Sequence, residues 1–431
     1  MSTNQPIYVG LLGAGTVGSG IIKILADNAD NIEQKVGVPV RIKKILVRNP
    51  AKARNVDIDA NLIVNNIDDI LNDNDISIVV EVMGGEHPAK EYMLQALEAG
   101  KHVVTANKDV VSRYGRELFE VAENKQVDFL FEGSVGGGIP IIRPLKQCLT
   151  ANKISEVMGI VNGTTNYMLT KMTRERIDFD EVLAEAQAKG YAEADPTADV
   201  GGLDAARKIA ILASIAFNTR VSVDDVYVEG ITNITLKDIE YASELGYVIK
   251  LLAIAKDDGN GINVRVHPAF IASTHPLAAV NDVFNAIYIK GDAVGEAMFY
   301  GRGAGQMPTA SAVTADIIDV ARDIHHGISS RILCTCYDQK PLQSVDQTES
   351  PFFIRLLVED KPGVLAAIAG AFGAQQVSLN SVIQKRKVDA CAELVLITYK
   401  VSTANLRLAI TSLSGMSVVR EVQSVIRVEE E

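Results

Sequence analysis

The stretch Ile7-Tyr-Val-Gly-Leu-Leu-Gly-Ala-Gly-Thr-Val-Gly18 decides how the N-terminal part of the chain folds. Its apolar first half predicts a strand, and the apolar periodicity that continues to Leu25 predicts a helix after the glycines. In this context Gly13 makes the tight turn, Gly15 lets the backbone approach a pyrophosphate, and Gly18 lets the helix pack closely. The stretch therefore predicts a dinucleotide site with contacts from Gly13, Gly15, Thr16, Val17 and Gly18.

The second predicted strand, Arg41-Ile-Lys-Lys-Ile-Leu-Val47, ends at Arg48. A site specific for NAD usually carries Asp or Glu at this point to bind the ribose hydroxyls, whereas an arginine suits the 2'-phosphate of NADP. We therefore predict NADP as the cofactor and leave NAD open. The alternative for Arg48 is an ordinary exposed arginine after a strand.

Strands and helices continue to alternate as far as residue 131. Apolar runs predict strands at 62–64, 76–82, 102–105 and 127–131, with helical patterns at 89–99 and 109–123. This order predicts a doubly wound parallel sheet of the Rossmann type, with ligands at the carboxyl ends of its strands. Thr105 and Lys108 emerge at that edge, so we expect both near the cofactor. A lysine that merely opened a helix would oppose the helix dipole.

The composition is that of a globular enzyme with two or three domains, since the chain has 431 residues and a 47% apolar fraction. A net charge of -12 and a pI near 5.1 argue against nucleic acid or an anionic membrane as the main partner. The N-terminus lacks a basic segment and no apolar run is long enough to span a bilayer, so we expect a cytoplasmic protein. The spacing of the cysteines fits neither a zinc finger nor a disulfide framework, and inert thiols are the default interpretation of Cys148, Cys334, Cys336 and Cys391.

A loop rich in carboxylates precedes a strongly apolar helix. The loop and the helix start bring together four carboxylates and a lysine, namely Glu193, Asp195, Asp199, Asp204 and Lys208. The run 209–217 is apolar almost all the way round, which is typical of a buried helix. Asp204 and Lys208 are four residues apart and share a face. A lysine near the positive end of a helix dipole has a lowered pKa, which suits proton transfer. The alternative is an acidic first turn with a lysine that snorkels to solvent.

Two glycine-rich segments frame the middle of the chain. The loop Glu132-Gly-Ser-Val-Gly-Gly-Gly-Ile-Pro140 exposes carbonyl oxygens that suit a small cation, although a plain hinge is the alternative. Gly301-Arg-Gly-Ala-Gly305 precedes a predicted helix at 309–324, and we expect its glycines to approach the cofactor from the other side. From Ile154 onward, strands, helices and a hairpin predict a mixed sheet for substrate binding and subunit pairing.

The C-terminal part has its own rhythm, a split β-α-β-β-α-β unit. Its strands are predicted at 352–358, 377–384, 391–401 and 418–428, and its helices at 364–375 and 405–413. We therefore predict a cofactor domain at 1–140, to which the helix at 306–325 returns, and an α+β domain at 141–305 for substrate binding and dimerisation. A linker at 326–350 and a ferredoxin-like domain at 351–431 complete the prediction.

Several long motifs, in the same order, resemble those of homoserine dehydrogenases in their long bacterial form. They are the glycine turn at 13–18, Thr105-Ala-Asn-Lys108, the loop at 132–140, Val161-Asn-Gly-Thr-Thr-Asn166 and the stretch 191–208. The resemblance covers the whole chain, and the tail with Asp360-Lys-Pro-Gly-Val-Leu365 resembles the ACT domain that this family often carries to sense an amino acid. It implies reversible NAD(P)-dependent conversion between L-aspartate 4-semialdehyde and L-homoserine, on the path to threonine, isoleucine and methionine.

The resemblance also implies roles for single residues. Lys208 would donate the proton, Lys108 would lie between cofactor and substrate, and Asp204 would orient Lys208. Glu193 and Asp199 would hold the amino end of the substrate. The pocket would also be lined by Thr164.

A cation site and one departure complete the resemblance. Na+ or K+ would bind, largely through backbone oxygens, at Glu132, Val135, Gly137 and Ile139, and Gly303 corresponds to a glycine at the cofactor. Arg176 stands where the family usually has glycine. It lies outside the site motifs and leaves the expected activity unchanged.

The expected partners are the small-molecule substrate, an amino-acid effector at the ACT domain, with L-threonine favoured, and further copies of the chain in a homodimer or homotetramer. A semialdehyde dehydrogenase that forms an acyl phosphate is the enzymatic alternative, but it needs an activated cysteine. No cysteine lies in a glycine-rich or histidine-bearing motif. A non-catalytic NADP-linked sensor is the other alternative, and it would not need Glu193, Asp199 and Lys208 together.

Overall fold

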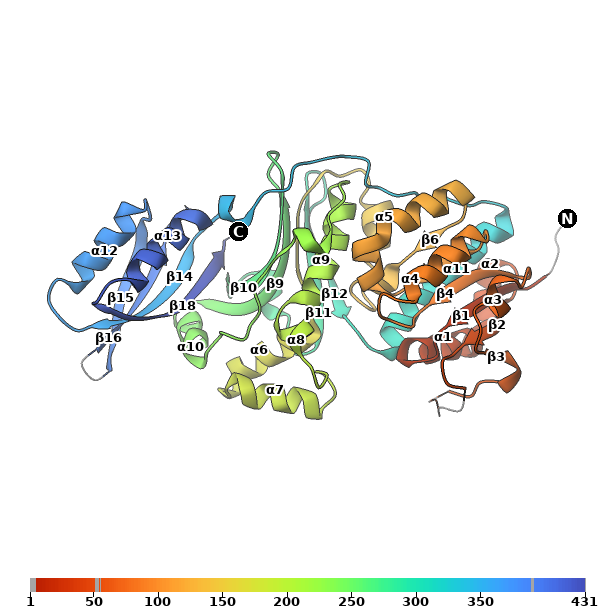
Figure 1. Cartoon of the computed structure of the whole chain (residues 1–431), viewed down its shortest axis with the longest axis horizontal. Coiled ribbons are helices and arrows are strands. Elements are labelled where there is room, and N and C mark those ends of the chain that lie inside the picture. The colour runs from red at the N-terminus through yellow and green to blue at the C-terminus, as the bar shows by residue number, and fades with distance from the viewer. Residues whose placement is uncertain (1–4, 51–53, 55, 389–390, 431) are drawn as a thin grey trace. The chain divides into compact units, whose positions relative to one another are not determined.

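The computed structural model describes residues 5–50, 54, 56–388 and 391–430 (Figure 1). The chain divides into two compact units, each built from separate stretches. The first unit comprises Met1–Val157, Arg207–Asp225 and Asn285–Gln339, and the second comprises Met158–Ala206, Val226–Phe284 and Lys340–Glu431. Among the described helices, none combines the length and the apolar character that crossing a membrane requires.

A six-stranded parallel sheet forms the centre of the first unit. Its strands are β1 Ile7–Leu12, β2 Val40–Leu46, β3 Ile63–Val64, β4 Ile76–Glu81, β5 His102–Thr105 and β6 Phe129–Leu130. They lie in the order β3-β2-β1-β4-β5-β6, with every pairing parallel. This is the strand order of doubly wound dinucleotide-binding sheets, so the predicted fold class is confirmed. The strand predicted at 127–131 is shorter because Phe131 leads into the 3-10 turn η2 Glu132–Ser134.

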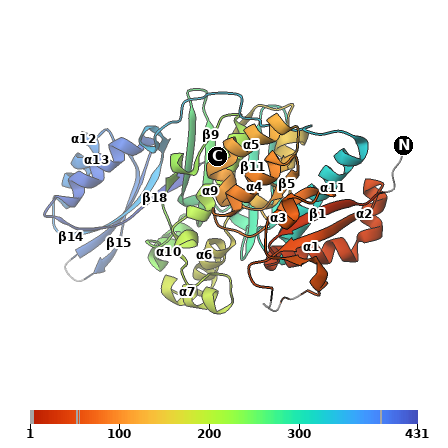
Figure 2. The same ribbon diagram turned by 45° about the vertical axis from the view of Figure 1, so that its right-hand side comes forward.

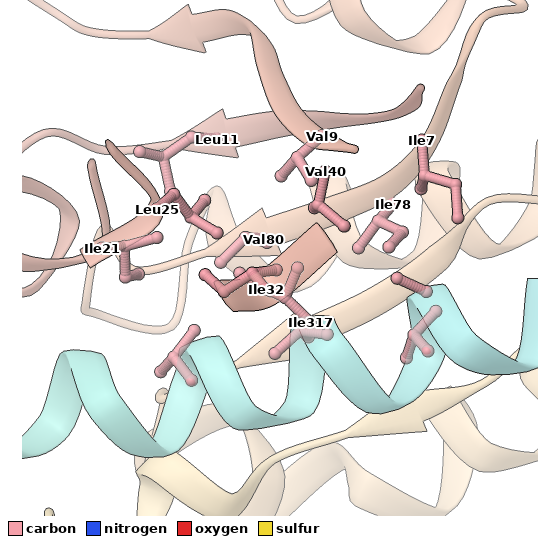
Figure 3. Close-up of a cluster of buried hydrophobic side chains, with 14 of the residues drawn as sticks. Ile7, Val9, Leu11, Ile21, Leu25, Ile32, Val40, Ile78, Val80 and Ile317 are labelled. Carbon is pink, nitrogen blue, oxygen red and sulfur yellow. The ribbon is translucent and has the colours of Figure 1, made fainter. Parts of the chain in front are cut away.

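Helices cover the faces of this sheet. They are α1 Thr16–Asp27, α2 Ala29–Val36, α3 Asp68–Leu71, α4 Ala89–Glu98, α5 Lys108–Lys125 and α11 Gln306–His326. α1 packs against α11 and α4 packs against α5. Although α11 is far from β5 in the sequence, its buried face belongs to the same apolar core as the strands. Figure 3 shows Ile317 pointing from α11 toward the strands that carry Val9 and Val80. Each aliphatic side chain buried there stabilises the unit by about 1.5–3 kcal/mol.

The first unit also contains two further strands and several short helical turns. β11 Phe284–Gly291 and β12 Gly295–Arg302 are hydrogen-bonded neighbours, and the short turns η1 Ala60–Leu62, η3 Pro144–Cys148 and η4 Val223–Asp225 connect other elements. The division between the units falls within β7 Ile154–Ile160 and within α9 Leu203–Ala216.

A long hairpin is the framework of the second unit. β9 Tyr247–Asp257 and β10 Ile262–Ala272 pair antiparallel along their whole length, as the sequence predicted, and β8 Tyr227–Val228 pairs parallel with β10. The helices α6 Gly163–Glu175 and α10 Leu236–Glu244 pack against β9, and α6 also contacts α7 Phe179–Ala188 and α8 Thr197–Val200. The turn η5 Pro276–Ala279 follows the hairpin.

The tail forms the predicted β-α-β-β-α-β unit. Its elements are β14 Phe352–Glu359, α12 Val364–Ala374, β15 Leu379–Val388, β16 Cys391–Thr398, α13 Thr403–Ser414 and β18 Val419–Glu429, preceded by η6 Val345–Gln347 and the small pair β13 Glu349–Ser350 and β17 Val401–Ser402. The strands lie in the order β18-β14-β16-β15 and every pairing is antiparallel. Figure 2 shows α12 and α13 side by side over one face of this sheet, and their buried residues form one core with it.

The tail sheet is continuous with the hairpin of the second unit, which the sequence did not predict. β18 pairs parallel with β10, with Ala269 opposite Arg427 and Ile271 opposite Glu429. Two buried ion pairs join the tail to the rest of the unit. Arg265 lies 2.8 Å from Glu429, and Arg355 lies 3.1 Å from Asp238.

A left-handed residue ends helix α6. Arg176 is the C-cap with φ 59°, and its N–H donates to Met172 O at 3.2 Å. This backbone conformation costs a residue with a Cβ roughly 1–2 kcal/mol and costs glycine almost nothing. The glycine that the resemblance implies at this position would therefore relieve a local strain at the end of the helix.

We predict that Arg176→Gly raises the free energy of unfolding by about 1 kcal/mol, because it removes the left-handed strain at the C-cap. The matched control is Arg174→Gly in the last turn of the same helix, which should lower stability by about 1 kcal/mol. Urea unfolding of the two variants and the parent protein measures both. Equal destabilisation by the two glycines would contradict the argument.

Candidate active site and cofactor cavity

A cavity of about 790 Å³ opens at the carboxyl ends of β1, β2 and β4 in the first unit. It is lined by residues of the glycine turn and of the loops after these strands, among them Gly13, Ala14, Gly15, Thr16, Arg48, Arg54, Val82, Met83, Gly84 and Gln306. The helix α1 begins at Thr16 on the wall of this cavity, so its first backbone N–H groups suit a phosphate.

The glycines of the turn fit a dinucleotide. A Cβ on Gly18 would lie 2.2 Å from Gly13 O, so no side chain can be placed between helix and turn. A Cβ on Gly15 would meet nothing within 4 Å, which leaves the backbone at this position open to a ligand. Val17 follows in the first turn of α1. Arg48 is exposed at the cavity wall directly after β2, where a 2'-phosphate is expected.

Glu81, at the end of β4, ties two loops of this edge together. Its carboxylate is fully buried, and burial raises its pKa. Thr105 Oγ1 donates to Glu81 Oε2 at 2.7 Å, and the N–H groups of Met83 and Gly84 donate to Oε1 at 2.7 and 3.3 Å. The hydroxyl of Thr105 therefore positions the loop that lines the cofactor cavity. Sequence reasoning missed Glu81, although a glutamate inside an apolar strand is a visible signal.

The two predicted lysines lie at helix starts. Lys108 is the first residue of α5, is half-buried and follows the N-cap Asn107, whose side chain accepts from Val110 N. Lys208 lies in the second turn of α9 and is only 9% exposed. A lysine this buried is rare unless it is paired, so the snorkelling alternative does not describe Lys208. Asp204 precedes it by one turn of the same helix and is also 9% exposed.

The predicted cation loop begins at Glu132, whose carboxylate accepts three hydrogen bonds from backbone N–H groups. Glu132 Oε1 accepts from the N–H groups of Ile141 and Ile142 at 2.6 and 2.8 Å, and Oε2 accepts from Arg143 N at 2.7 Å. Asp316 on α11 accepts from Glu132 N at 2.8 Å and from Arg143 Nη2 at 2.5 Å. Burial, together with the nearby charge of Glu132, raises the pKa of Asp316 to about 7.

The cation loop and the second glycine segment are in direct contact. A Cβ on Gly137 would lie 2.4 Å from Gly303 O, and Gly138 N donates to Arg302 O at 3.0 Å. Gly136 and Gly137 have φ values of 74° and 54°, a conformation that turns successive carbonyl groups in different directions. Val135 and Ile139 are fully buried on either side of these glycines. Two segments that are distant in sequence thus form one irregular wall.

An asparagine amide joins two of the predicted carboxylates in the second unit. Asn162 Nδ2 donates to Asp199 Oδ1 at 2.7 Å and to Asp204 Oδ2 at 2.9 Å. Asn162 Oδ1 accepts from Thr165 N at 2.9 Å, which caps helix α6. Asn162 is 5% exposed, so the two hydrogen bonds from its amide nitrogen hold both carboxylates inside the protein. Sequence reasoning placed Asn162 in a motif without giving it a role.

The other predicted substrate residues also belong to the second unit. Thr164 is buried, and its hydroxyl donates to Tyr191 O at 2.7 Å, which anchors the carboxylate-rich loop. Gln187 Nε2 donates to the backbone oxygens of Glu193 and Ala194 at 3.1 and 3.3 Å. The side chain of Glu193 is exposed. The loop is thus held by its backbone while this carboxylate faces solvent.

Comparison with known proteins assigns the family. A model described as the NAD binding domain of homoserine dehydrogenase matches residues 13–132, one described as homoserine dehydrogenase matches 140–318, and an ACT domain model matches 352–414. The homoserine dehydrogenase of Bacillus subtilis (strain 168) is 45% identical over 99% of each chain. The chain belongs to the homoserine dehydrogenase family. It is therefore an NAD(P)-dependent oxidoreductase that carries an ACT domain.

Solved structures agree with this assignment. A homoserine dehydrogenase from Thiobacillus denitrificans superposes with a TM-score of 0.94 at 41% identity, over 99% of each chain. A hyperthermophilic archaeal homoserine dehydrogenase mutant, solved in complex with NADPH, is 26% identical with a TM-score of 0.62 and covers 73% of this chain and 98% of its own. The Rossmann-type unit, the mixed sheet and the ACT domain are therefore shared with relatives of the same family.

We predict that Asn162→Asp lowers kcat/KM by about tenfold or more, because it keeps the cap on α6 but replaces the donor between Asp199 and Asp204 with a third negative charge. The loss should shrink as the pH falls and the new carboxylate is protonated. Steady-state kinetics at several pH values measure this. A variant with parent kinetics at neutral pH would show that the amide has no part in catalysis.

Proposed function

We propose that the enzyme reversibly reduces L-aspartate 4-semialdehyde to L-homoserine with NADPH, in the biosynthesis of threonine, methionine and isoleucine. The observation that carries this proposal is the pair of carboxylates, Asp199 and Asp204, that the amide of Asn162 joins, with the buried Lys208 one turn further along α9. A cationic proton donor and fixed carboxylates are what an amino-acid aldehyde requires. The reaction itself is the one that the family name describes.

Each residue has a distinct task in this proposal. Lys208 gives a proton to the oxygen on which negative charge develops, and it stabilises that charge. Asp204, on the same helix face, orients Lys208. Glu193 and Asp199 hold the ammonium group of the substrate, with Thr164 lining the pocket and Lys108 between cofactor and substrate. The nicotinamide ring of the bound cofactor supplies the hydride.

NADP is the proposed cofactor, with NAD as the alternative. Arg48 is exposed at the cavity wall after β2, where an acidic residue would favour NAD. Gly13, Gly15, Thr16, Val17 and Gly18 supply the turn and helix start, Thr105 positions the adjacent loop, and Gly303 comes from the second glycine segment. The archaeal relative solved with NADPH supports the same choice.

A monovalent cation, Na+ or K+, is proposed at the loop of Glu132, Val135, Gly137 and Ile139. The donor chemistry fits, because the glycine-rich turn presents backbone oxygens and the carboxylate of Glu132 is already used by three N–H groups. Because Gly137 contacts Gly303, a cation there would stiffen the wall next to the cofactor.

The ACT domain is proposed to bind L-threonine as a feedback inhibitor. Helix α12 begins at Val364 after the turn Asp360-Lys-Pro-Gly363, and free N–H groups at a helix start suit the carboxylate of an amino acid. We further propose that the enzyme works in the cytoplasm as a homodimer or homotetramer. The acidic composition and the four free cysteines support this location.

We predict that Lys208→Ala lowers kcat by about 10²- to 10⁴-fold and leaves NADPH binding unchanged, since the glycine turn is not altered. Lys208→Arg is the matched variant, because it keeps the charge but cannot release a proton at neutral pH. Stopped-flow or steady-state NADPH oxidation with the semialdehyde measures the rate, and fluorescence titration measures binding. If Lys208→Ala kept the kcat of the parent enzyme, Lys208 would not be the proton donor.

Arg48→Ala should raise the KM for NADPH much more than the KM for NADH, by a difference of about 1.5–3 kcal/mol, because only NADPH carries the 2'-phosphate. The control is Arg41→Ala, because Arg41 is also an exposed arginine but lies on β2 and does not line the cavity. Initial-rate kinetics with both cofactors decide the question. Equal changes with the two cofactors would make Arg48 an ordinary surface residue.

The effector proposal is best tested by a point substitution, because deleting the tail would leave Arg265 buried without Glu429. We predict that Ala366→Asp raises the threonine concentration for half inhibition about fivefold or more while basal activity stays unchanged. Ala366 is exposed in the first turn of α12, so a carboxylate there stabilises the helix but repels the ligand. Ala369→Asp, further along the same exposed surface, is the control. The proposal would be refuted if calorimetry showed that threonine does not bind to the parent protein.

A further inference from the structure

A small cavity of about 20 Å³ in the first unit is lined by two cysteines and two cations. Cys334 and Cys336 come from the segment after α11, Lys146 comes from η3, and Arg220 follows the end of α9. The cavity shares no described lining residue with the cofactor cavity. It is therefore a second place where nucleophilic side chains gather.

A guanidinium donates to the sulfur of Cys334. Arg220 Nη2 lies 3.0 Å from Cys334 Sγ, and Cys336 lines the same cavity. The neighbouring Cys336 and the charges of Arg220 and Lys146 lower the pKa of Cys334 against the opposing effect of burial. A lowered pKa favours the thiolate, the form in which cysteine is a nucleophile.

Cys336 lies beside Cys334 in the wall of the same cavity. Its interaction with Cys334, together with burial, raises the pKa of Cys336, which favours the protonated thiol. Its Sγ is 3.6 Å from Ser214 O in the last turns of α9. Asn218 Nδ2 donates to Thr335 O at 3.0 Å and Asp338 N donates to Asn218 O at 2.8 Å, which fixes the segment against the end of α9.

The charges around the pair favour an anion and disfavour a metal ion. Lys146 Nζ lies 4.9 Å from the centre of the Phe119 ring, and burial lowers the pKa of Lys146 to about 8. The guanidinium of Arg220 lies 3.0 Å from the sulfur of Cys334. A carboxylate, Glu123, accepts from Cys334 N at 2.9 Å. With two sulfurs and two cationic side chains, the cavity suits a thiolate and its oxidised products better than a soft cation.

We propose that Cys334 and Cys336 form a redox-modification site, at which a hydroperoxide oxidises Cys334 and Cys336 then closes an intrachain disulfide. Both cysteines are half-buried, so a small hydroperoxide can reach them. The pair lies against the end of α9, the helix that carries Lys208.

The reaction balances in two steps. The thiolate of Cys334 attacks one peroxide oxygen, so an S–O bond forms, the O–O bond breaks, and the hydroxide or alkoxide that leaves takes up a proton. The thiol of Cys336 then attacks the sulfenic sulfur, an S–S bond forms, the S–O bond breaks, and water leaves with the proton of Cys336. Two thiols are oxidised and one hydroperoxide is reduced. A small thiol restores the reduced pair by exchange.

The test treats the full-length protein with hydrogen peroxide and maps its thiols by mass spectrometry, with the exposed Cys148 as the internal reference. We expect the peptide that contains Cys334 and Cys336 to lose two hydrogens, reversibly with dithiothreitol. In Cys336→Ser, the sulfenic acid on Cys334 should accumulate and be trapped by dimedone. Cys334→Ser should abolish both products, and Cys391→Ser should change neither.

Alkylation rates give an independent measure that needs no variant. The rate at Cys334 should stay nearly constant between about pH 6.5 and 8, whereas an ordinary thiol reacts about tenfold faster for each pH unit below its pKa. Three outcomes would overturn the proposal. They are a rate at Cys334 that rises with pH like that at Cys148, a disulfide that fails to form, and purified protein that holds a stoichiometric soft metal on the pair.

Discussion

A carboxylate buried at the carboxyl edge of the parallel sheet sets the shape of the cofactor cavity. Glu81 has no exposed surface, so each oxygen must find donors inside the protein, and an unmet one would cost about 1–3 kcal/mol or more. The donors are the hydroxyl of Thr105 and the N–H groups of Met83 and Gly84. These hydrogen bonds join the loop after β4 to the end of β5. The buried carboxyl group of Glu81 thereby fixes the part of the cavity wall that Met83 and Gly84 form.

Buried charge also explains why the tail is part of the second unit's sheet. Burial alone would raise the pKa of Glu429, yet the charges of Arg265 and Lys256 outweigh it and lower that pKa to about 2. Breaking such a buried pair by removing one partner costs about 3–5 kcal/mol. Because Glu429 ends β18 and Arg265 lies on β10, the pair holds the parallel contact between the two strands. The ACT domain is therefore joined directly to the hairpin through the pairing of β18 with β10.

Local signals in the sequence predicted most of the first unit, whereas contacts between distant segments left no such signal. The glycine spacing and the alternation of apolar runs depend on neighbouring residues, so the parallel sheet followed from them and was confirmed. The pairing of β18 with β10 depends on which strand edges meet across a long intervening stretch of chain, and neither strand carries that information. Asn162 was visible only as part of a motif, because its hydrogen bonds to two carboxylates depend on a loop that comes much later in the chain. The Cys334 and Cys336 pair was taken for inert thiols because its cationic partners come from η3 and from beyond α9.

Helix α9 gives the proposed proton donor a position that does not depend on flexible loops. Its central residues, including Ala206, Ile209, Ala210 and Leu212, are fully buried, so the helix cannot rotate or shift without opening cavities in the core. Side chains at positions i and i+4 on a helix lie about 5–6 Å apart at Cβ, which fixes Lys208 relative to Asp204. Asp204 is fixed in turn through Asn162 to Asp199. Asp199, proposed to bind the substrate, and Lys208, proposed to protonate it, are thus linked through the amide of Asn162, Asp204 and helix α9.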